Sequence, residues 1–317
     1  MNGRDMMNPT QLPWARFAFL GLLLAGLGAC GGSGSGASAV APSAGSSTTP
    51  ASLPSTPTSA PGWGGHFIGA VTIGGVDYYG DALLTSDGTI RLYVGGPYAD
   101  DGTVQQSRPE SSEQFVGKLQ VNVDQASGSG VIIGQQCAPP HEHTGFCGES
   151  ASGEIHISQY VIGPGDFGIK GEIQVTANNA TATWPLDLAS LGIWVGPVGL
   201  EEVQGKYQEE LAEFALDGDT IVSIDLAGQL FFQSAHSGCI GNGTLAPHLD
   251  GKFAIFDVTL TIASCNAPYN YLNGEFEGLA TTNASSIWDY DSLLWIFLSR
   301  QDGAQPPAAV TMLGLPM

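Results

Sequence analysis

Apolar and polar residues alternate along short segments of the chain from about residue 63 onward. In segment 118–124, Leu119, Val121 and Val123 are each followed by a polar residue. This period of two is typical of a β-strand with one buried face and one face in water. Similar segments, rich in Val, Ile, Thr, Tyr and Phe and bounded by turn-forming residues, lie at 89–94, 154–158 and 253–262. The pattern predicts an all-β body.

Between the predicted strands lie turn signals and one segment with helical rather than strand-like spacing. Asp-Gly pairs at 87–88 and 217–218 predict turns between strands. In segment 201–216, Tyr207, Leu211 and Phe214 recur at helical spacing among several glutamates, which indicates a helix. A comparison of the two halves of the body favours a strand at the start of this segment instead.

The two halves share four landmarks in the same order. The pairs are Gly65 and Gly205, Gly88 and Gly228, Gly171 and Gly274, and Trp184 and Trp288. The first two landmarks are separated by 23 residues in both halves. Such ordered similarity indicates an internal duplication.

Each half is therefore expected to form one antiparallel domain of about six to eight strands, a barrel-like or sandwich fold in which closure removes exposed strand edges. We expect a first β domain at 63–198 and a second at 199–303. The remaining residues, 304–317, are mildly apolar and are expected to be a C-terminal tail, either a final strand or a loose end.

The first 61 residues have a different composition. An apolar run of eleven residues, 17–27, follows a segment that carries Arg4 and Arg16 against Asp5. The run is too short to cross a bilayer as a helix, which needs about 20 residues, and is typical of a secretory signal peptide. Residues 31–61 are nearly all Gly, Ser, Ala, Thr and Pro without a charge, which predicts a disordered linker.

Leu27-Gly28-Ala29-Cys30 resembles the lipobox of bacterial lipoproteins, in which a branched apolar residue and two small residues precede the cysteine. The resemblance implies a signal peptide over 1–29 and a lipidated Cys30, carrying palmitate or similar acyl groups, at the start of a linker over 30–62. The alternative is an ordinary secretory signal with an incidental cysteine.

The resemblance also implies a location. Gly31 stands where an aspartate would favour the inner membrane, so the family pattern implies a lipid anchor in the outer membrane, on its periplasmic or its surface face. The body is similar to small, duplicated β-rich lipoproteins of Gram-negative bacteria, most of which have no assigned function.

Charge narrows the range of partners. The chain has nine basic and 30 acidic residues, and the leader holds two of the basic ones. Because binding to phosphates depends on Lys and Arg, nucleic acid and anionic lipid headgroups are not expected as partners. The expected partners are the membrane, through the lipid anchor, and an unknown envelope protein or ligand; no cofactor is predicted.

Four cysteines remain besides Cys30. An even number in an exported protein predicts disulfides, with three possible connectivities. Proximity in sequence favours Cys137–Cys147 and Cys239–Cys265, one pair in each half.

The loop between Cys137 and Cys147 contains His141, Glu142 and His143. Imidazole and carboxylate groups are ligands of Zn²⁺ and Cu²⁺, and a disulfide would hold the loop in place. The segment is thus a candidate metal site, and the alternative is a polar loop tip.

Trp184 and Trp288 each precede an aspartate by three residues. They are either apolar plugs of the two domains or the floor of a ligand pocket. A structural or binding role without catalysis is expected, and no catalytic residue is singled out. The alternative is an envelope enzyme that acts on glycans through paired carboxylates.

Overall fold

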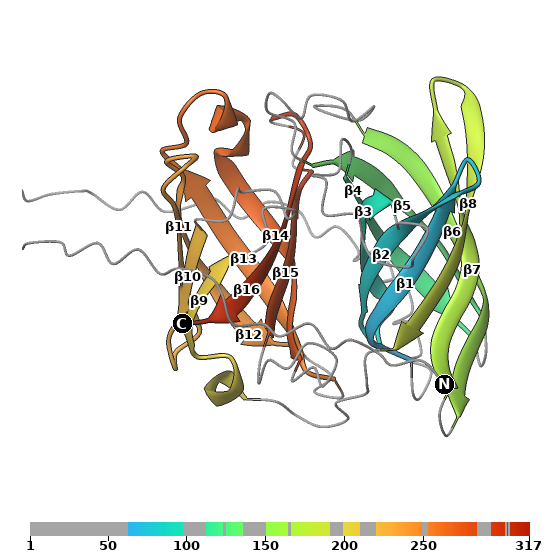
Figure 1. The fold of residues 1–317 in the computed structure, drawn as a ribbon, viewed down its shortest axis with the longest axis horizontal. Coiled ribbons are helices and arrows are strands. Elements are labelled where there is room, and N and C mark those ends of the chain that lie inside the picture. The colour runs from blue at the N-terminus through green and yellow to red at the C-terminus, as the bar shows by residue number, and fades with distance from the viewer. Residues whose placement is uncertain are drawn as a thin grey trace, which may run out of the picture. The chain divides into compact units, whose positions relative to one another are not determined.

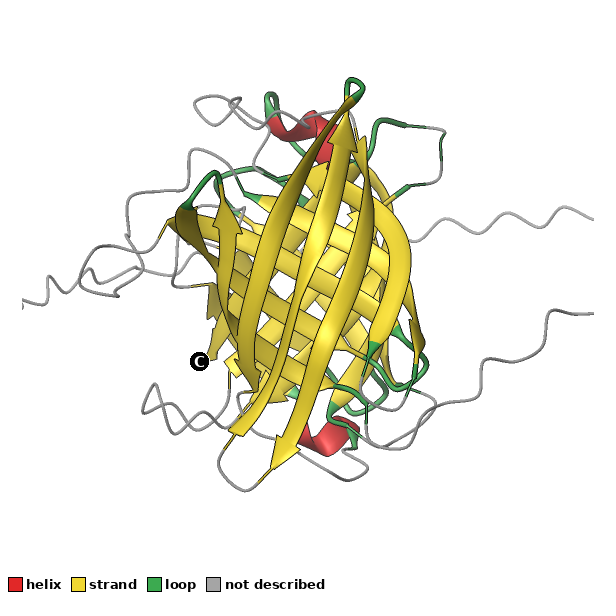
Figure 2. Ribbon diagram, turned by 90° about the vertical axis from the view of Figure 1, so that its right-hand side faces the viewer, coloured by secondary structure: helices red, strands yellow, loops and turns green. Residues whose placement is uncertain are grey.

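In the part of the chain that the computed structural model describes, most residues lie in β-strands (Figures 1 and 2). The structure describes residues 63–97, 112–122, 125–135, 150–163, 166–190, 199–209, 220–248, 253–283, 293–301, 303 and 305–317. Within these residues the only helical elements are two short 3₁₀ helices, η1 (Leu200–Glu202) and η2 (Tyr269–Leu272). The prediction of an all-β body is confirmed.

The first half forms a closed antiparallel barrel, here called barrel 1. Its strands are β1 (Gly65–Ile73), β2 (Val76–Leu84), β3 (Thr89–Pro97), β4 (Glu113–Val121), β5 (Ala126–Gly134), β6 (Ser150–Gly163), β7 (Asp166–Ala177) and β8 (Ala180–Ser190). Each strand pairs with the next, and β8 returns to pair with β1, where Ala189 is the register partner of Ile68. Closure leaves barrel 1 without a free sheet edge.

The second half forms another closed barrel of eight strands, barrel 2. Its strands are β9 (Gly205–Glu209), β10 (Thr220–Ile224), β11 (Gln229–Ser234), β12 (Ile240–Pro247), β13 (Ile255–Ala263), β14 (Gly274–Asn283), β15 (Leu293–Arg300) and β16 (Ala308–Pro316). Pairing of β16 with β9 closes the barrel. Two tandem antiparallel barrels are thus the fold, and the sandwich alternative is set aside.

Two features of barrel 2 decide points that the sequence left open. Residues 205–209 form the strand β9, and the helical spacing that runs on from Tyr207 extends into residues outside the described part. Of the two alternatives for segment 304–317, a final strand or a loose end, the structure contains the strand, β16. The second domain therefore extends beyond residue 303, because the side chains of Ala308 to Leu313, apolar except for Thr311, are all buried and belong to the barrel wall.

The first two landmark pairs mark equivalent places. Gly88 and Gly228 end the turns before β3 and β11, with φ values of +88° and +73°. At each, an added Cβ would lie 2.2 Å from the carbonyl oxygen of a leucine, Leu119 or Leu245. The same leucine donates its backbone N–H to the glycine carbonyl at 2.8 Å in both barrels. Close approach and positive φ explain why glycine recurs here.

The third landmark pair is corrected by the topology. Gly171 lies in β7, the seventh strand of barrel 1, whereas Gly274 begins β14, the sixth strand of barrel 2. Short Gly-acid-apolar sequences recur in neighbouring strands, as Gly153 and Glu154 show on β6, so the match was misleading. Trp288, in the fourth pair, lies outside the described residues.

Apolar side chains that alternate with outward-facing ones fill both barrels. The interior of barrel 1 includes Phe67, Leu92, Phe115, Ile155, Ile173 and Trp184. The interior of barrel 2 includes Tyr207, Phe232, Phe256, Leu260, Phe276 and Met312. These side chains form packed cores of the kind that fills the inside of small barrels.

The barrels also bury part of their outer faces against each other. All eight residues of β15 are buried, because Leu294, Ile296 and Leu298 face the interior while the residues between them face barrel 1. One apolar cluster contains residues of both barrels: Leu83, Tyr93, Phe253, Ile255, Leu279, Leu293, Trp295, Phe297 and Leu313. A strand that is buried on both faces does not alternate between apolar and polar residues. The strand at this interface, β15, is therefore a continuous apolar run over residues 293–298.

Polar groups complete the contact between the barrels. Arg91 donates a hydrogen bond to the hydroxyl of Ser299. The side-chain amides of Gln114 and Gln135 both lie within hydrogen-bond distance of the hydroxyl of Thr311, at 3.2 and 3.0 Å. These bonds fix the side chains of two different barrels to one another.

Candidate functional site

The interiors of the barrels leave little reason to place a ligand inside them. Trp184, considered above as a possible pocket floor, is 5% exposed and packs in the apolar core of barrel 1. Its position favours the plug over the pocket. Three hollows formed by described residues lie on the outer faces of the barrels.

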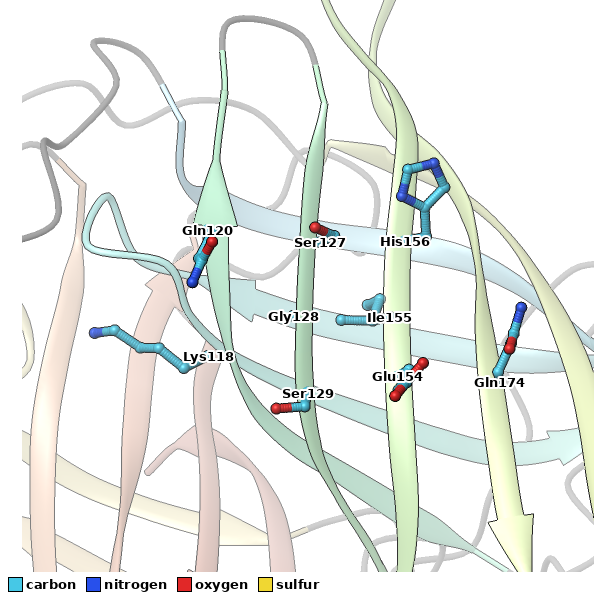
Figure 3. Close-up of a pocket in the computed structure, with 9 residues that line it drawn as sticks. All are labelled: Lys118, Gln120, Ser127, Gly128, Ser129, Glu154, Ile155, His156 and Gln174. Atoms are coloured by element: carbon cyan, nitrogen blue, oxygen red, sulfur yellow. The ribbon is translucent and has the colours of Figure 1, made fainter.

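The most polar of these hollows, here called the polar groove, lies on the outer face of β4–β7 (Figure 3). Two rows of side chains cross these strands in register. One row contains Lys118, Ser129, Glu154 and Gln174, and the other contains Gln120, Ser127 and His156. The two serines of β5 are short, whereas the flanking side chains are long. The face is therefore hollowed along β5.

The strand β5 is suited to this place by its composition. It alternates serine with glycine at Ser127, Gly128, Ser129 and Gly130. The glycines face the interior, where a Cβ at Gly130 would lie 2.2 Å from the carbonyl oxygen of Val116. The serines face outward, so the strand brings hydroxyl groups to the groove with little side-chain bulk.

One end of the groove is fixed by an ion pair. Lys118 contacts the carboxylate of Asp87 and lies 3.1 Å from the hydroxyl of Thr89. Burial would raise the pKa of Asp87, but hydrogen bonds from Lys118, Thr85 and Thr89 outweigh it and hold that pKa well below its ordinary value. The lysine charge is thus partly compensated.

The groups in the polar groove can form hydrogen bonds with a ligand. Amides, hydroxyls, an imidazole and a carboxylate offer both donors and acceptors to a ligand. A nucleophilic serine needs a base within hydrogen-bond reach. Ser127 is the register partner of His156, but among the described residues no hydrogen bond joins these two side chains. The lining residues include the carboxylate Glu154, and a second carboxylate, Glu172, is the register partner of His156 and accepts a hydrogen bond from Gln174 at 3.3 Å.

The corresponding row of barrel 2 is partly covered. Thr244 is equivalent to Lys118, because each directly precedes one of the two equivalent leucines, Leu245 and Leu119. From Thr244 the row across barrel 2 continues through Thr259, Glu277 and Ser299. Arg91 of barrel 1 bonds to Ser299 and lies 4.0 Å from Glu277. The same four-strand face is therefore open in barrel 1 and partly occupied in barrel 2.

One of the two predicted disulfides lies within the described part of the chain, and most of the other predicted site residues lie outside it. The Cys239–Cys265 disulfide is confirmed, with an S–S distance of 2.03 Å, and it joins the segments that flank β12 and β13. Cys30, the Cys137–Cys147 pair and the candidate metal ligands His141, Glu142 and His143 lie outside the described residues. Within the described part of the chain, no group of three or more His, Cys, Asp or Glu residues could hold a metal ion.

The polar groove was not predicted from the sequence. Its residues come from four strands and are brought together by strand register, which no local spacing reveals. The one local indication is the serine-glycine alternation of β5, because small residues on both faces of a strand are typical of a close approach or a hollow.

Comparisons with models of protein families, with curated proteins and with solved structures found no match to this chain. Among the residues that the structure describes, no helix is both long and apolar enough to span a membrane.

Proposed function

We propose that this protein is a lipid-anchored component of the bacterial cell envelope whose barrels bind a hydrogen-bonding ligand without transforming it. The lipobox-like sequence that ends at Cys30 supports the anchor and the outer membrane as its location. The charge-free linker supports a folded body held away from the bilayer.

One observation supports binding most directly. Both barrels have interiors filled with apolar side chains, whereas the outer face of β4–β7 carries a groove lined with polar side chains from four strands. A scaffold with a packed core and a rigid sheet face holds polar groups in fixed positions, which lowers the entropy cost of binding. The open groove does not exclude water, which most enzymes must do around reactive intermediates.

The anchor is tested by Cys30→Ser in cells that process lipoproteins. The wild-type protein should fractionate with outer membranes and incorporate a labelled fatty acid. The variant should lose the label and leave the membrane fraction, because its membrane affinity comes from the acyl chains. Retention of Cys30→Ser in washed membranes would contradict the anchor.

Binding is tested with the full chain, purified in detergent and immobilised. Envelope polysaccharide and protein fractions are passed over the wild type and over a Gln120→Ala/Glu154→Ala double variant. Val76→Ala, an exposed position at the start of β2 that does not line the groove, is the control. We expect the double variant alone to lose retention of a component. Equal retention by all three proteins would show that the polar groove is not the binding site.

A further inference from the structure

A second outer face, formed by β9–β12, has a different chemistry from the polar groove. Six large apolar residues are exposed among the described residues, and three of them, Ile221, Phe231 and Ile240, lie on this face. Phe231 is 40% exposed and stands in the middle strand of the three. An aromatic ring that remains exposed in a packed barrel is a candidate contact for a ligand.

Polar groups surround Phe231 on both sides. Ser223 on β10 and Asn242 on β12 are its register partners, so their side chains point to the same side of the sheet. The hollow over these strands is also lined by Lys206, Gln229 and Asp225. The Asp225 carboxylate is held at the rim, because its Oδ1 accepts backbone N–H bonds from Ala227 and Gln229 at 2.9 and 2.8 Å.

The hollow continues across barrel 2. Asn242 and Gly243 also line an adjoining hollow, which contains Thr259, Thr261 and Glu275. In register, Asn242 is the partner of Thr261, and Thr261 is the partner of Glu275. An outer-face row therefore runs from Phe231 through an amide and a hydroxyl to a carboxylate, over four neighbouring strands.

We propose that this row, together with the face around Phe231, binds a neutral glycan chain, with one sugar ring stacked on Phe231. A pyranose ring has an apolar C–H face and a rim of hydroxyls. The C–H face complements the negative face of an aromatic ring, and the hydroxyls complement amide, hydroxyl and carboxylate groups placed around it. The inference rests on the proposed function, since it names the ligand class for one outer face.

Charge favours a neutral glycan over an anionic one. The two hollows contain Asp225, Glu275 and Glu277 against Lys206 and Arg300, and Arg300 already binds the backbone carbonyls of Tyr271 and Asn273. The whole chain has a formal net charge of −21. Carboxylated or phosphorylated polymers would meet this field as like charges.

The exposed area favours a glycan over a protein partner. Ile221, Phe231 and Ile240 are 36, 40 and 39% exposed, so each is already more than half covered by barrel 2. A stable protein interface buries about 800 Å² on each partner around a well-packed apolar centre. Three partly covered side chains within a polar face do not supply such a centre, whereas a single sugar ring needs only one ring to stack on.

The test uses the full chain in detergent, titrated calorimetrically with cellohexaose, hexa-N-acetylchitohexaose and maltohexaose, and with an oligogalacturonate of the same length as the anionic probe. At least one neutral hexasaccharide should bind and be recovered intact by chromatography. No heat from any neutral probe at millimolar concentration, tighter binding of the anionic probe, or hydrolysis of the bound probe would each overturn the proposal.

Substitutions at Phe231 distinguish ring stacking from general apolar contact. Phe231→Ala should weaken binding of the neutral probe about tenfold, the order of magnitude of one aromatic contact. Phe231→Leu keeps an apolar side chain without a ring and should lose affinity to a similar degree, whereas Phe231→Trp should retain it. Val76→Ala, at an exposed position of barrel 1, is the control and should bind as the wild type does.

Wild-type affinity of Phe231→Leu would show that stacking is not the basis of binding. Failure here is separable from failure of the proposed function. If an envelope component is retained through the polar groove while Phe231→Ala changes nothing, the proposed function stands and the glycan site on β9–β12 is wrong.

Discussion

Arg91 in barrel 1 and Phe231 in barrel 2 stand at equivalent positions, three residues after the turn glycines Gly88 and Gly228. Arg91 is 5% exposed because barrel 2 covers it, whereas Phe231 faces solvent. The register partners of these two residues differ in the same way. Leu83, the partner of Arg91, is buried, whereas Ser223, the partner of Phe231, lines an outer hollow. The two barrels have the same strand order, but the equivalent outer face is an interface in barrel 1 and an open surface in barrel 2.

The difference shows how a duplicated barrel can avoid assembling without limit. Barrel 1 places its β1–β5 outer face on the β13–β16 outer face of barrel 2, which is a heterologous contact, and repetition of such a contact between copies would produce a filament. The equivalent face of barrel 1 is the outer face of β5–β8, where His156 and Glu172 stand at the positions that Leu279 and Phe297 occupy in barrel 2. The apolar centre of the contact is therefore absent from this face of barrel 1.

The largest contrast in unfolding free energy is expected between Trp295, in the interface of the two barrels, and Phe231, on the open face of barrel 2. Trp295 is buried between the barrels and its ring meets the His66 ring edge-on at 5.3 Å. Trp295→Ala should lower the free energy of unfolding by about 4 kcal/mol, because it removes a buried aromatic and leaves a cavity. Urea denaturation followed by circular dichroism measures the loss.

The matched substitution is Phe231→Ala on the open face. It should change the free energy of unfolding by less than about 1 kcal/mol, because its side chain is exposed. Equal losses for Trp295→Ala and Phe231→Ala would contradict the assignment of one face as interface and the other as open.

A smaller contrast is expected for the polar groups. Asp81 is fully buried, where it lies 2.7 Å from Nε2 of His66 and accepts a hydrogen bond from the Tyr79 hydroxyl at 2.9 Å. Asp81→Ala should cost about 3 kcal/mol, because it leaves the polar groups of these partners without their acceptor. The equivalent position in barrel 2 is Ile221, and Ile221→Ala should cost about 1 kcal/mol. A cost for Ile221→Ala as large as that for Asp81→Ala in the same denaturation assay would argue against the equivalence.

These contrasts explain which parts of the structure the sequence could predict. Alternation, turn glycines and the spacing of Gly65 from Gly88 reflect contacts within one hairpin, so they predicted strands, turns and the first part of the repeat. The Cys239–Cys265 pair was predicted from proximity in sequence, and the structure places the two residues at the ends of the neighbouring strands β12 and β13. Local pattern was sufficient wherever the partners lie close in sequence.

The interface and the candidate sites depend on register between distant strands. Gln114 meets Thr311, and Lys118 shares a row with Gln174, through pairings that no local spacing encodes. The apolar run at 293–298 and the run at 308–313, which is apolar except for Thr311, were the available indication of a second buried face. Gly171 and Gly274 show how a local pattern can mislead. The short motif that matched them lies in the seventh strand of barrel 1 and in the sixth strand of barrel 2.

The last contrast concerns the pH dependence of stability and a carboxyl group at the end of barrel 1. Glu113 lies six residues before Leu119, just as Cys239 lies six before Leu245, so a titrating group in barrel 1 corresponds to a disulfide sulfur in barrel 2. Burial raises the pKa of Glu113 to about 7. Between pH of about 4.5, its ordinary value, and about 7, the folded chain binds a proton that the unfolded chain lacks, so stability falls as pH rises through this window.

Glu113→Gln removes that dependence while keeping the shape and hydrogen-bonding capacity of the protonated acid. At pH 5 the variant and the wild type should unfold at the same urea concentration, because Glu113 is then mostly neutral in the folded chain. At pH 8 the variant should be more stable by about 2 kcal/mol, because the wild type must fold with a buried charge. Glu154→Gln, at an exposed position on the outer face of β6, is the control and should shift neither midpoint. If Glu113→Gln follows the wild-type pH profile, the carboxyl is not buried in the folded state. Barrel 1 would then end in a solvated mouth where barrel 2 is closed by its disulfide.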